Sequence, residues 1–312
     1  MHPSDCWRRE EDGGGSRLGP MNRRARSIGT LLLSGATLVA CGGGGDLVGG
    51  GSPTTSALRL CDGSAGVRLA ARVGGGGPVG LGRYMRSENG FEFLLVTGTC
   101  EAWVLPDDAQ PLRHLTLTSA QESALVTDLR VARWSALAMR TPPAGGCSDA
   151  SSLTYRFDQA HYQSPGCGVD PTDELALVDR AFDVKLQELA AAGAPAAGDA
   201  RYLVLEGDGS TAADLYYKNP APWPLGVAPA TVAVPRDQIF SQPTTGRSLR
   251  VSGDDARKLR ALRADFLAGR IGNVMFEDYI PIVTTDSAYY ELYIRDVSPF
   301  EGADGLIGPG IF

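Results

Sequence analysis

Histidine and recognisable catalytic motifs are scarce in this sequence. Of three histidines in 312 residues, only His114 and His161 follow residue 41. The chain has no G-x-S-x-G, H-E-x-x-H, P-loop or S-x-x-K pattern, which are signatures of serine hydrolases, zinc peptidases, nucleotide-binding proteins and β-lactamases. These absences exclude the common motif-bearing forms of those proteins. They favour a protein that acts by binding or as a structural component.

An excess of basic residues is also missing. The chain has 29 Lys and Arg against 36 Asp and Glu, a net charge of −7. Residues 1–40 contain six arginines and four acidic residues, so the chain from Cys41 onward carries −9. An acidic body without a basic stripe argues against nucleic-acid binding. With 43% hydrophobic and 21% charged residues, the composition is that of a globular protein rather than a disordered chain.

The apolar run near the amino terminus is too short to span a bilayer of about 30 Å as a helix. It covers Ile28–Ala40 and follows three arginines between residues 23 and 26. A basic segment followed by a short apolar one is typical of a signal peptide. We therefore predict a removed leader over residues 1–40, with a signal peptide from Met21 to Ala40 and an untranslated stretch over 1–20.

The end of this apolar run is Leu38-Val39-Ala40-Cys41, which resembles the lipobox of bacterial lipoprotein precursors. The resemblance implies that the Cys41 thiol receives a diacylglycerol, that the bond before it is cut and that the new amino group is acylated, commonly with palmitate. Several acyl chains make a lasting membrane anchor where one is marginal. Gly42, rather than Asp, implies the outer membrane. A signal peptide without lipidation is the alternative.

Residues 41–58 are rich in glycine, and we predict a flexible tether there. Beyond the tether the patterns predict a first unit over 59–192, a linker rich in Ala, Gly and Pro over 193–200, and a second unit over 201–312. Strands are expected at 66–73, 91–96, 100–105, 113–117, 153–157, 201–206, 215–218, 230–234, 274–284 and 288–296.

Three helices are expected between these strands. Thr118 and Gln121 have capping-box spacing before a helix that reaches Arg130. Asp170 is the expected N-cap of the second helix, with Pro171 at its first position and its end near Gly193. The third begins at Ser252 and ends at Gly269. This order lacks the alternation of a doubly wound sheet and predicts an α+β fold: antiparallel sheets with helices packed on one face.

Four cysteines remain after Cys6 and Cys41 are set aside. An even number in an exported chain indicates two disulfides. Among three pairings we favour Cys61–Cys100 and Cys147–Cys167, because each closes a moderate loop within one region. A metal site at Cys147, His161 and Cys167 is the alternative, and no C-x-x-C spacing supports it. No cofactor is expected.

Candidate catalytic chemistry centres on Asp158 and His161, which lie in a loop-like stretch. An Asp-oriented histidine is a conceivable general base, although no other part of a hydrolase site is recognisable. Glu206, Asp208 and Asp214 offer oxygen ligands to calcium, but their spacing does not match an EF-hand, and a turn explains them better.

The aromatic strand near the carboxyl terminus is the strongest sign of a binding surface. Tyr289, Tyr293 and Arg295 share one face of this strand with Glu291, a mixture typical of ligand and partner surfaces. Cross-strand pairing in an exposed sheet is the alternative. The expectation is a lipid-anchored envelope protein of binding or structural role, with the membrane and an envelope protein or glycan as partners. An envelope hydrolase near His161 is the second hypothesis.

Overall fold

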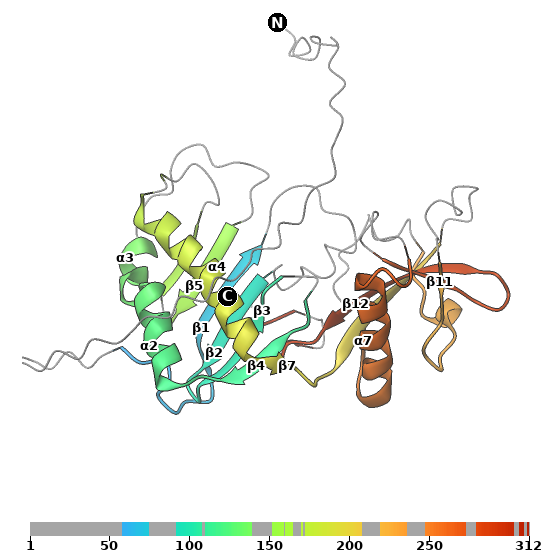
Figure 1. Cartoon of the computed structure of the whole chain (residues 1–312), viewed down its shortest axis with the longest axis horizontal. Helices are drawn as coiled ribbons and strands as arrows, with labels where there is room; N and C mark the ends of the chain where they lie inside the picture. The colour runs from blue at the N-terminus through green and yellow to red at the C-terminus, as the bar shows by residue number, and fades with distance from the viewer. Residues whose placement is uncertain are drawn as a thin grey trace, which may run out of the picture. The chain divides into compact units, whose positions relative to one another are not determined.

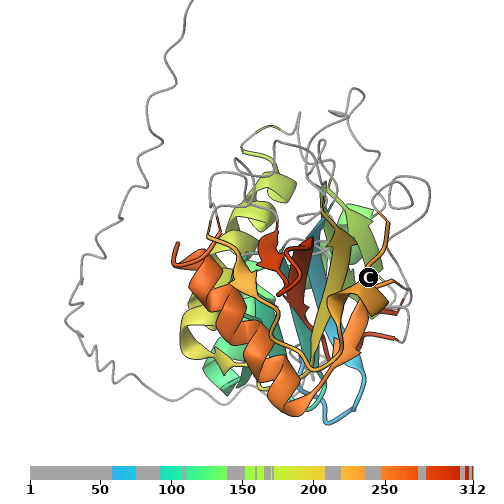
Figure 2. The same cartoon turned by 90° about the vertical axis from the view of Figure 1, so that its right-hand side faces the viewer.

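The computed structural model describes residues 58–74, 92–107, 110–138, 152–158, 160–164, 170, 172–207, 219–235, 247–272, 279–302, 306–308 and 311. These ranges contain helices and two mostly antiparallel sheets (Figures 1 and 2), which confirms the predicted α+β fold. Residues Thr55–Phe312 belong to one compact unit. Among the described residues, no helix combines the length and apolar character needed to cross a membrane.

The first sheet has seven strands in the order β6-β5-β1-β2-β3-β4-β7, and every neighbouring pair is antiparallel. Five of the predicted strands appear in it. β6 was not predicted. Its residues were expected to form a loop, but they pair with β5, so that Tyr162 lies opposite Tyr155. The bounds are β1 (Val67–Gly74), β2 (Glu92–Thr97), β3 (Glu101–Leu105), β4 (Arg113–Thr116), β5 (Ser152–Phe157), β6 (Ala160–Gln163) and β7 (Ala194–Pro195).

Helices cover one face of this sheet (Figure 1). The capping box before α2 is confirmed: the Gln121 amide donates to Thr118 Oγ1 at 3.3 Å, and the Thr118 amide donates to Gln121 Oε1 at 2.9 Å. These bonds satisfy helix-end amides that have no partner within the helix. The elements are α2 (Ser119–Asp128), the 3₁₀ turn η1 (Val131–Arg133), α3 (Trp134–Ala138) and α4 (Glu174–Ala192).

The predicted N-cap residue of α4 was wrong. Asp173, not Asp170, accepts from the Leu175 amide at 2.9 Å and begins the helix. The Asp170 carboxylate instead accepts from the Thr172 amide at 2.8 Å, which forms a side-chain turn ahead of the helix. Both aspartates have capping chemistry, and only the folded chain shows which of the two caps the helix.

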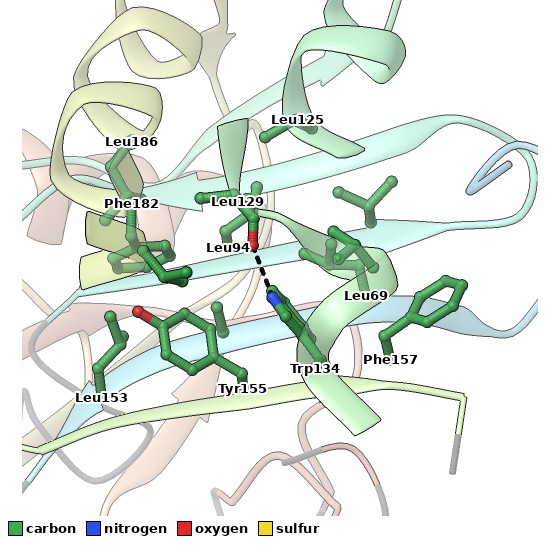
Figure 3. Close-up of a cluster of buried hydrophobic side chains, with 14 of the residues drawn as sticks. Leu69, Leu94, Leu125, Leu129, Trp134, Leu153, Tyr155, Phe157, Phe182 and Leu186 are labelled. Carbon is green, nitrogen blue, oxygen red and sulfur yellow. Dashed lines mark hydrogen bonds between the residues drawn. The ribbon is translucent and has the colours of Figure 1, made fainter. Parts of the chain in front are cut away.

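The largest hydrophobic core lies between the helices and the first sheet (Figure 3). Trp134 is 1% exposed, and its indole N–H donates to the Leu129 carbonyl at 2.7 Å, so its single polar group is satisfied. Tyr155 packs against Trp134 from the sheet side and against Phe182 from α4. Burial of large rings of this kind supplies much of the hydrophobic stabilisation of a domain.

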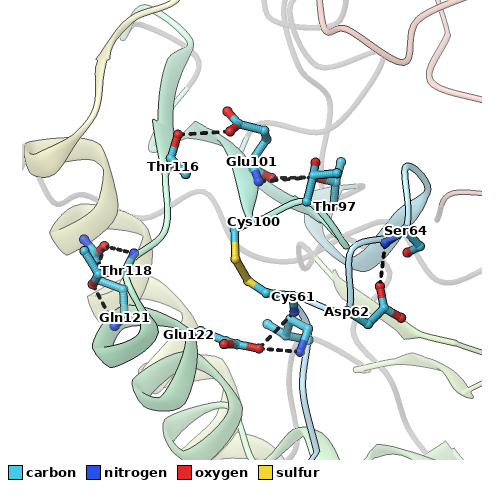
Figure 4. Close-up of a disulfide and its surroundings, with 12 residues drawn as sticks. Cys61, Asp62, Ser64, Thr97, Cys100, Glu101, Thr116, Thr118, Gln121 and Glu122 are labelled. Atoms are coloured by element: carbon cyan, nitrogen blue, oxygen red, sulfur yellow. Dashed lines mark hydrogen bonds between the residues drawn. A yellow bond between two sulfur atoms is a disulfide. The ribbon is translucent and has the colours of Figure 1, made fainter.

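A disulfide joins Cys61 to Cys100, which confirms that prediction (Figure 4). It ties the segment before β1 to the turn before β3. Beside it, the buried Glu122 carboxylate accepts from the amides of Leu60 at 2.8 Å and Cys61 at 2.9 Å. A disulfide and two hydrogen bonds therefore attach the segment that follows the predicted tether to the folded body. The predicted Cys147–Cys167 pair and the lipid-bearing Cys41 lie outside the described residues.

The second sheet has the order β10-β8-β12-β11-β9, with β9 parallel to β11 and all other pairs antiparallel. Its strands are β8 (Ala200–Glu206), β9 (Ala221–Pro222), β10 (Leu249–Val251), β11 (Ile280–Val283) and β12 (Tyr289–Asp296). The helix α7 (Gly253–Leu267) packs on one face through Ala256, Leu259 and Phe266. This helix and the β11–β12 hairpin were predicted.

The strand predicted at 230–234 is absent. A 3₁₀ turn, η2 (Pro229–Thr231), occupies its start. Only Val234 reaches the sheet, through an isolated bridge to Leu205. Pro229 fixes φ and has no N–H to donate, so it favours a turn over a strand here. The strand predicted at 215–218 lies outside the described residues.

The two sheets come from consecutive parts of the chain, and the change occurs between β7 and β8, inside the predicted linker. The chain end then returns to the first sheet. Phe300, Ile307 and Ile311 pack against that sheet's second face, next to Phe93 and Leu95. The division into two units stays a prediction, because this return joins the end of the second unit to the first.

Candidate functional site

The proposed histidine site is not assembled by the fold. Asp158 lies in the β5–β6 turn with φ 49°, and its carboxylate pairs with the Arg68 guanidinium at 3.0 Å. His161 is exposed on β6 and lies opposite Arg156. Among the described contacts, no hydrogen bond joins Asp158 to His161. The hydrolase hypothesis gains no support from this arrangement, because the carboxylate meant to orient the imidazole is bound elsewhere.

The other described histidine packs against an aromatic ring. His114 stacks on Trp103, with ring centroids 4.8 Å apart, and its Nε2 lies 2.5 Å from Glu101 Oε2. Phe300 contacts the same tryptophan edge-on at 5.3 Å. This is a cross-strand packing arrangement on the second face of the first sheet.

The aromatic face of β12 is buried rather than open. Tyr293 is 3% exposed and its hydroxyl donates to the Glu291 carboxylate at 2.8 Å. Arg295 is 5% exposed and donates to Glu301 Oε2 at 2.6 Å. Tyr289 is half-buried at the start of the strand. Glu301, in the segment that follows β12, covers Arg295, whereas Tyr293 packs against Tyr279 and Val234.

A pocket of about 480 Å³ lies where the segment after β9 meets the β11–β12 hairpin. We call it the aromatic pocket. Two rings, Trp223 and Tyr290, and five proline or aliphatic residues form much of its wall. A cavity of this size accommodates a small molecule. The described lining consists of Pro222, Trp223, Ala228, Pro229, Ala230, Val283, Thr284, Thr285, Asp286 and Tyr290.

Local structure fixes the orientation of Trp223. Its indole N–H donates to the Val227 carbonyl, which closes the loop after β9. The ring also meets Tyr202 of β8 edge-on, with centroids 6.1 Å apart. The indole nitrogen is therefore satisfied within the protein. What the ring offers to the pocket is its apolar, π-electron-rich surface.

Tyr290 contributes a phenol to the pocket wall. Its side chain belongs to a residue only 8% exposed, and its hydroxyl makes no hydrogen bond to any described residue. Burial and the nearby carboxylates of Asp286 and Glu206 raise the pKa of Tyr290. The phenol is therefore neutral at physiological pH and keeps its proton for donation. Tyr290 lines the pocket, and an aromatic ring with a polar tip is a common component of ligand sites.

Asp286 supplies a charge at the pocket rim. The Thr284 hydroxyl donates to its carboxylate, and this hydrogen bond lowers the pKa of Asp286. The same hydroxyl is 3.1 Å from the Ala288 carbonyl, so the hairpin turn holds both side chains. Asp286 is exposed and ionised at neutral pH, and it faces solvent beside the aromatic walls.

The sequence does not mark these residues as a site. Each has an ordinary local role: Tyr290 packs with the α7 core, and Asp286 stands in the hairpin turn. A pocket arises only because β9 pairs in parallel with β11, which brings residues 221–230 beside 283–290. No local pattern signals that long-range pairing.

A second polar cluster lies beneath α4. Asp179 Oδ1 accepts from the Tyr155 hydroxyl at 2.6 Å, and its Oδ2 accepts from the fully buried Ser164 hydroxyl at 2.9 Å. Burial raises the pKa of Asp179, an effect that these two hydrogen bonds only partly offset. The groups satisfy one another, so the cluster holds α4 on the sheet.

This cluster predicts a pH dependence of stability. The pKa of Asp179 in the folded state lies above its ordinary value of 3.8. At pH values between the ordinary pKa and the raised one, the folded state therefore binds a proton that the unfolded chain does not bind. The carboxyl's contribution to the free energy of unfolding therefore rises as pH falls from neutral through the raised pKa. Urea unfolding of the chain and of Asp179→Asn at several pH values measures it. A difference between the two proteins that stays constant with pH would contradict the prediction.

Among the described residues, no group of three or more His, Cys, Asp or Glu side chains has the arrangement of a metal site. Cys147 and Cys167 of the proposed metal site, and Asp208 and Asp214 of the proposed calcium site, lie outside these residues. Comparison of the chain with protein-family models, curated proteins and solved structures found no match.

Proposed function

We propose that this chain is a membrane-anchored binding protein of the bacterial cell envelope, and that the aromatic pocket is its ligand site. One observation carries the proposal: a pocket of about 480 Å³ is lined by two aromatic rings that the fold holds in place, Trp223 and Tyr290, beside the carboxylate of Asp286. A ligand in the pocket covers the rings. The burial of apolar surface drives binding.

The anchor in this proposal is Cys41, in the lipobox-like Leu38-Val39-Ala40-Cys41. Gly42 after it favours the outer membrane as the destination. The glycine-rich stretch 41–58 provides reach between the membrane and the body. A flexible chain of that length gives an end-to-end distance on the order of 20 to 25 Å, enough for the body to turn toward ligands near the surface.

Replacing the Cys41 thiol tests the proposed attachment to the membrane. We expect Cys41→Ser to abolish incorporation of labelled palmitate and to release the protein from the membrane fraction, because serine offers no thioether attachment. Cys61→Ser is a useful comparison, since it removes a cysteine of the body and leaves the lipobox-like segment intact. A Cys41→Ser protein that still takes up the label and sediments with membranes would contradict the anchor.

A ligand screen tests the pocket. The full-length chain in a non-ionic detergent is melted with a panel of small cationic, neutral and anionic compounds. A compound that binds the folded state raises the Tm, by a stabilisation of about 2.7 kcal/mol when its concentration is about 100 times Kd. We expect such compounds to lose their effect in Ala230→Trp, which fills the pocket, and in Trp223→Ala, which removes a wall.

The two variants differ in their expected effect on the stability of the protein. Trp223→Ala also removes the contact with Tyr202 and lowers the baseline Tm, whereas Ala230 is exposed, so its replacement leaves the core intact. Asp265→Asn on α7 is the matched control, because Asp265 pairs with Arg270 and does not line the pocket. Compounds that stabilise the chain and Ala230→Trp equally would place binding elsewhere and contradict the proposal.

A further inference from the structure

The charges that the described residues bring to the aromatic pocket are negative. Asp286 lines it, and Glu206 lies opposite Tyr290 in the β8–β12 register, on the same face of the sheet. Burial first, and then the charges of these two carboxylates, raise the pKa of the Tyr290 phenol. Among the described lining residues there is no Lys, Arg or His. An anion entering this pocket meets these two negative charges, and the described lining offers no basic group to offset them.

The walls are suited to an organic cation. Trp223 is the best aromatic partner for a cation, and tyrosine also serves, because the ring face carries negative electrostatic potential. The Trp223 N–H is bound to Val227, which leaves the ring surface as its contribution. Pro222, Pro229 and Val283 add apolar surface, and apolar surface suits a charge that is shielded by methyl or methylene groups rather than tightly hydrated.

The polar groups of the rim fit the same ligand. The Thr284 hydroxyl is already bound to Asp286 and lies within reach of the Ala288 carbonyl. The Tyr290 hydroxyl is free to bond a single polar atom of a ligand. The pocket thus combines one hydroxyl contact, a pair of aromatic rings and an ionised carboxylate at its mouth.

We propose that the aromatic pocket binds an organic cation, an ammonium group carried on a short apolar stem, with the cationic head between Trp223, Tyr290 and Asp286. This proposal rests on the proposed function and names the chemical class of its ligand. Desolvated cation–aromatic contacts contribute more than exposed ones, and the carboxylate adds Coulomb attraction that salt weakens.

Choline and its uncharged isostere 3,3-dimethyl-1-butanol test the charge requirement at constant shape. In calorimetric titrations of the full-length chain in a non-ionic detergent, we expect choline to bind about tenfold more tightly than the alcohol, the ratio that one cation–aromatic contact assisted by a carboxylate supplies. Asp286→Asn keeps the shape of the rim and removes its charge. We expect this variant to reduce the preference severalfold and to weaken the salt dependence of choline binding.

Two further variants locate the head and check the fold. Tyr290→Phe keeps the ring and removes the hydroxyl, so the preference for the cation is expected to persist with lower affinity for both probes. Asp265→Asn, away from the pocket, is expected to bind both as the unmodified chain does. Equal binding of choline and the alcohol overturns the cation proposal, and so does the absence of choline binding. The binding function itself stands in either case if neutral compounds of the panel show stabilisation that Ala230→Trp abolishes.

Discussion

Replacing Glu301 with alanine is expected to lower the free energy of unfolding by about 3 to 5 kcal/mol, because it breaks a buried ion-pair cluster. The Glu301 side chain is fully buried, and it joins two arginines that lie side by side in the second sheet. Arg201 is 3% exposed and Arg295 is 5% exposed. Alanine removes the buried carboxylate that pairs with both guanidinium groups.

The geometry around Glu301 accounts for the size of this effect. Its two carboxylate oxygens accept from Arg201 Nε, from Arg295 Nη1 at 2.6 Å and Nη2 at 3.1 Å, and from the Ser298 amide at 3.3 Å. Arg201 also donates to the carbonyls of Ser248 and Gly302, each at 3.0 Å. The network fixes the segment after β12, whose neighbour Phe300 packs on the first sheet. Loss of the carboxylate therefore loosens that attachment as well.

Urea unfolding of the chain and of Glu301→Ala measures the change. The control, Asp265→Asn, removes a surface carboxylate that is 46% exposed and pairs with Arg270, and we expect a change within about 0.5 kcal/mol. Joint replacement of Arg201 and Arg295 by Met and of Glu301 by Leu is expected to cost less than Glu301→Ala alone, because both guanidinium charges are removed together with the carboxylate that they bind. A Glu301→Ala protein as stable as the control would contradict the prediction that the Glu301 carboxylate stabilises the fold.

Removing the Cys61–Cys100 disulfide is expected to cost about 4 kcal/mol in the chain-entropy model. The bond closes a loop with a sequence separation of 39 residues, and opening it gives the unfolded chain many more conformations. Paired Cys61→Ala and Cys100→Ala substitutions are preferable to a reducing agent, which acts on every disulfide of the protein. Equilibrium unfolding in urea measures the loss as a lower transition midpoint.

Glu122→Gln is the matched comparison for the disulfide variant. It weakens the hydrogen bonds to the Leu60 and Cys61 amides in the same segment while keeping the covalent link, and we expect a smaller loss of about 1 to 3 kcal/mol. Peptide mapping under non-reducing conditions verifies the bond before the comparison. An unchanged midpoint in the double alanine variant, with the bond verified in the parent chain, would contradict the prediction.

The sequence indicated the fold where local chemistry decides it. Thr118 and Gln121 have the spacing of a capping box, and that box forms. The apolar residues of α4, from Leu175 to Leu189, repeat at helical spacing and are buried. Cys61 and Cys100 bond as expected. Backbone hydrogen bonding over a few residues, side-chain periodicity and loop closure are all readable along one chain.

The sequence was a poorer guide to the candidate site. Tyr293 and Arg295 look like members of an open aromatic face, yet Glu301 and its segment cover Arg295, and Tyr293 bonds Glu291 inside the protein. Asp158 and His161 are close in sequence, yet Arg68 of β1 holds the aspartate. In each case the deciding partner is distant in the chain. Exposure and pairing depend on such distant contacts, which periodicity does not reveal.

By itself, the sequence determined the α+β class, most strand and helix positions, the Cys61–Cys100 bond and the acidic character of the body, and it supplied the lipobox-like segment on which the anchor proposal rests. Only the tertiary structure decided which aromatic residues line a cavity. The parallel pairing of β9 with β11 sets Trp223 opposite the hairpin that carries Asp286 and Tyr290. Propensities and caps act over a few residues, whereas a pocket requires segments that only long-range strand pairing brings together.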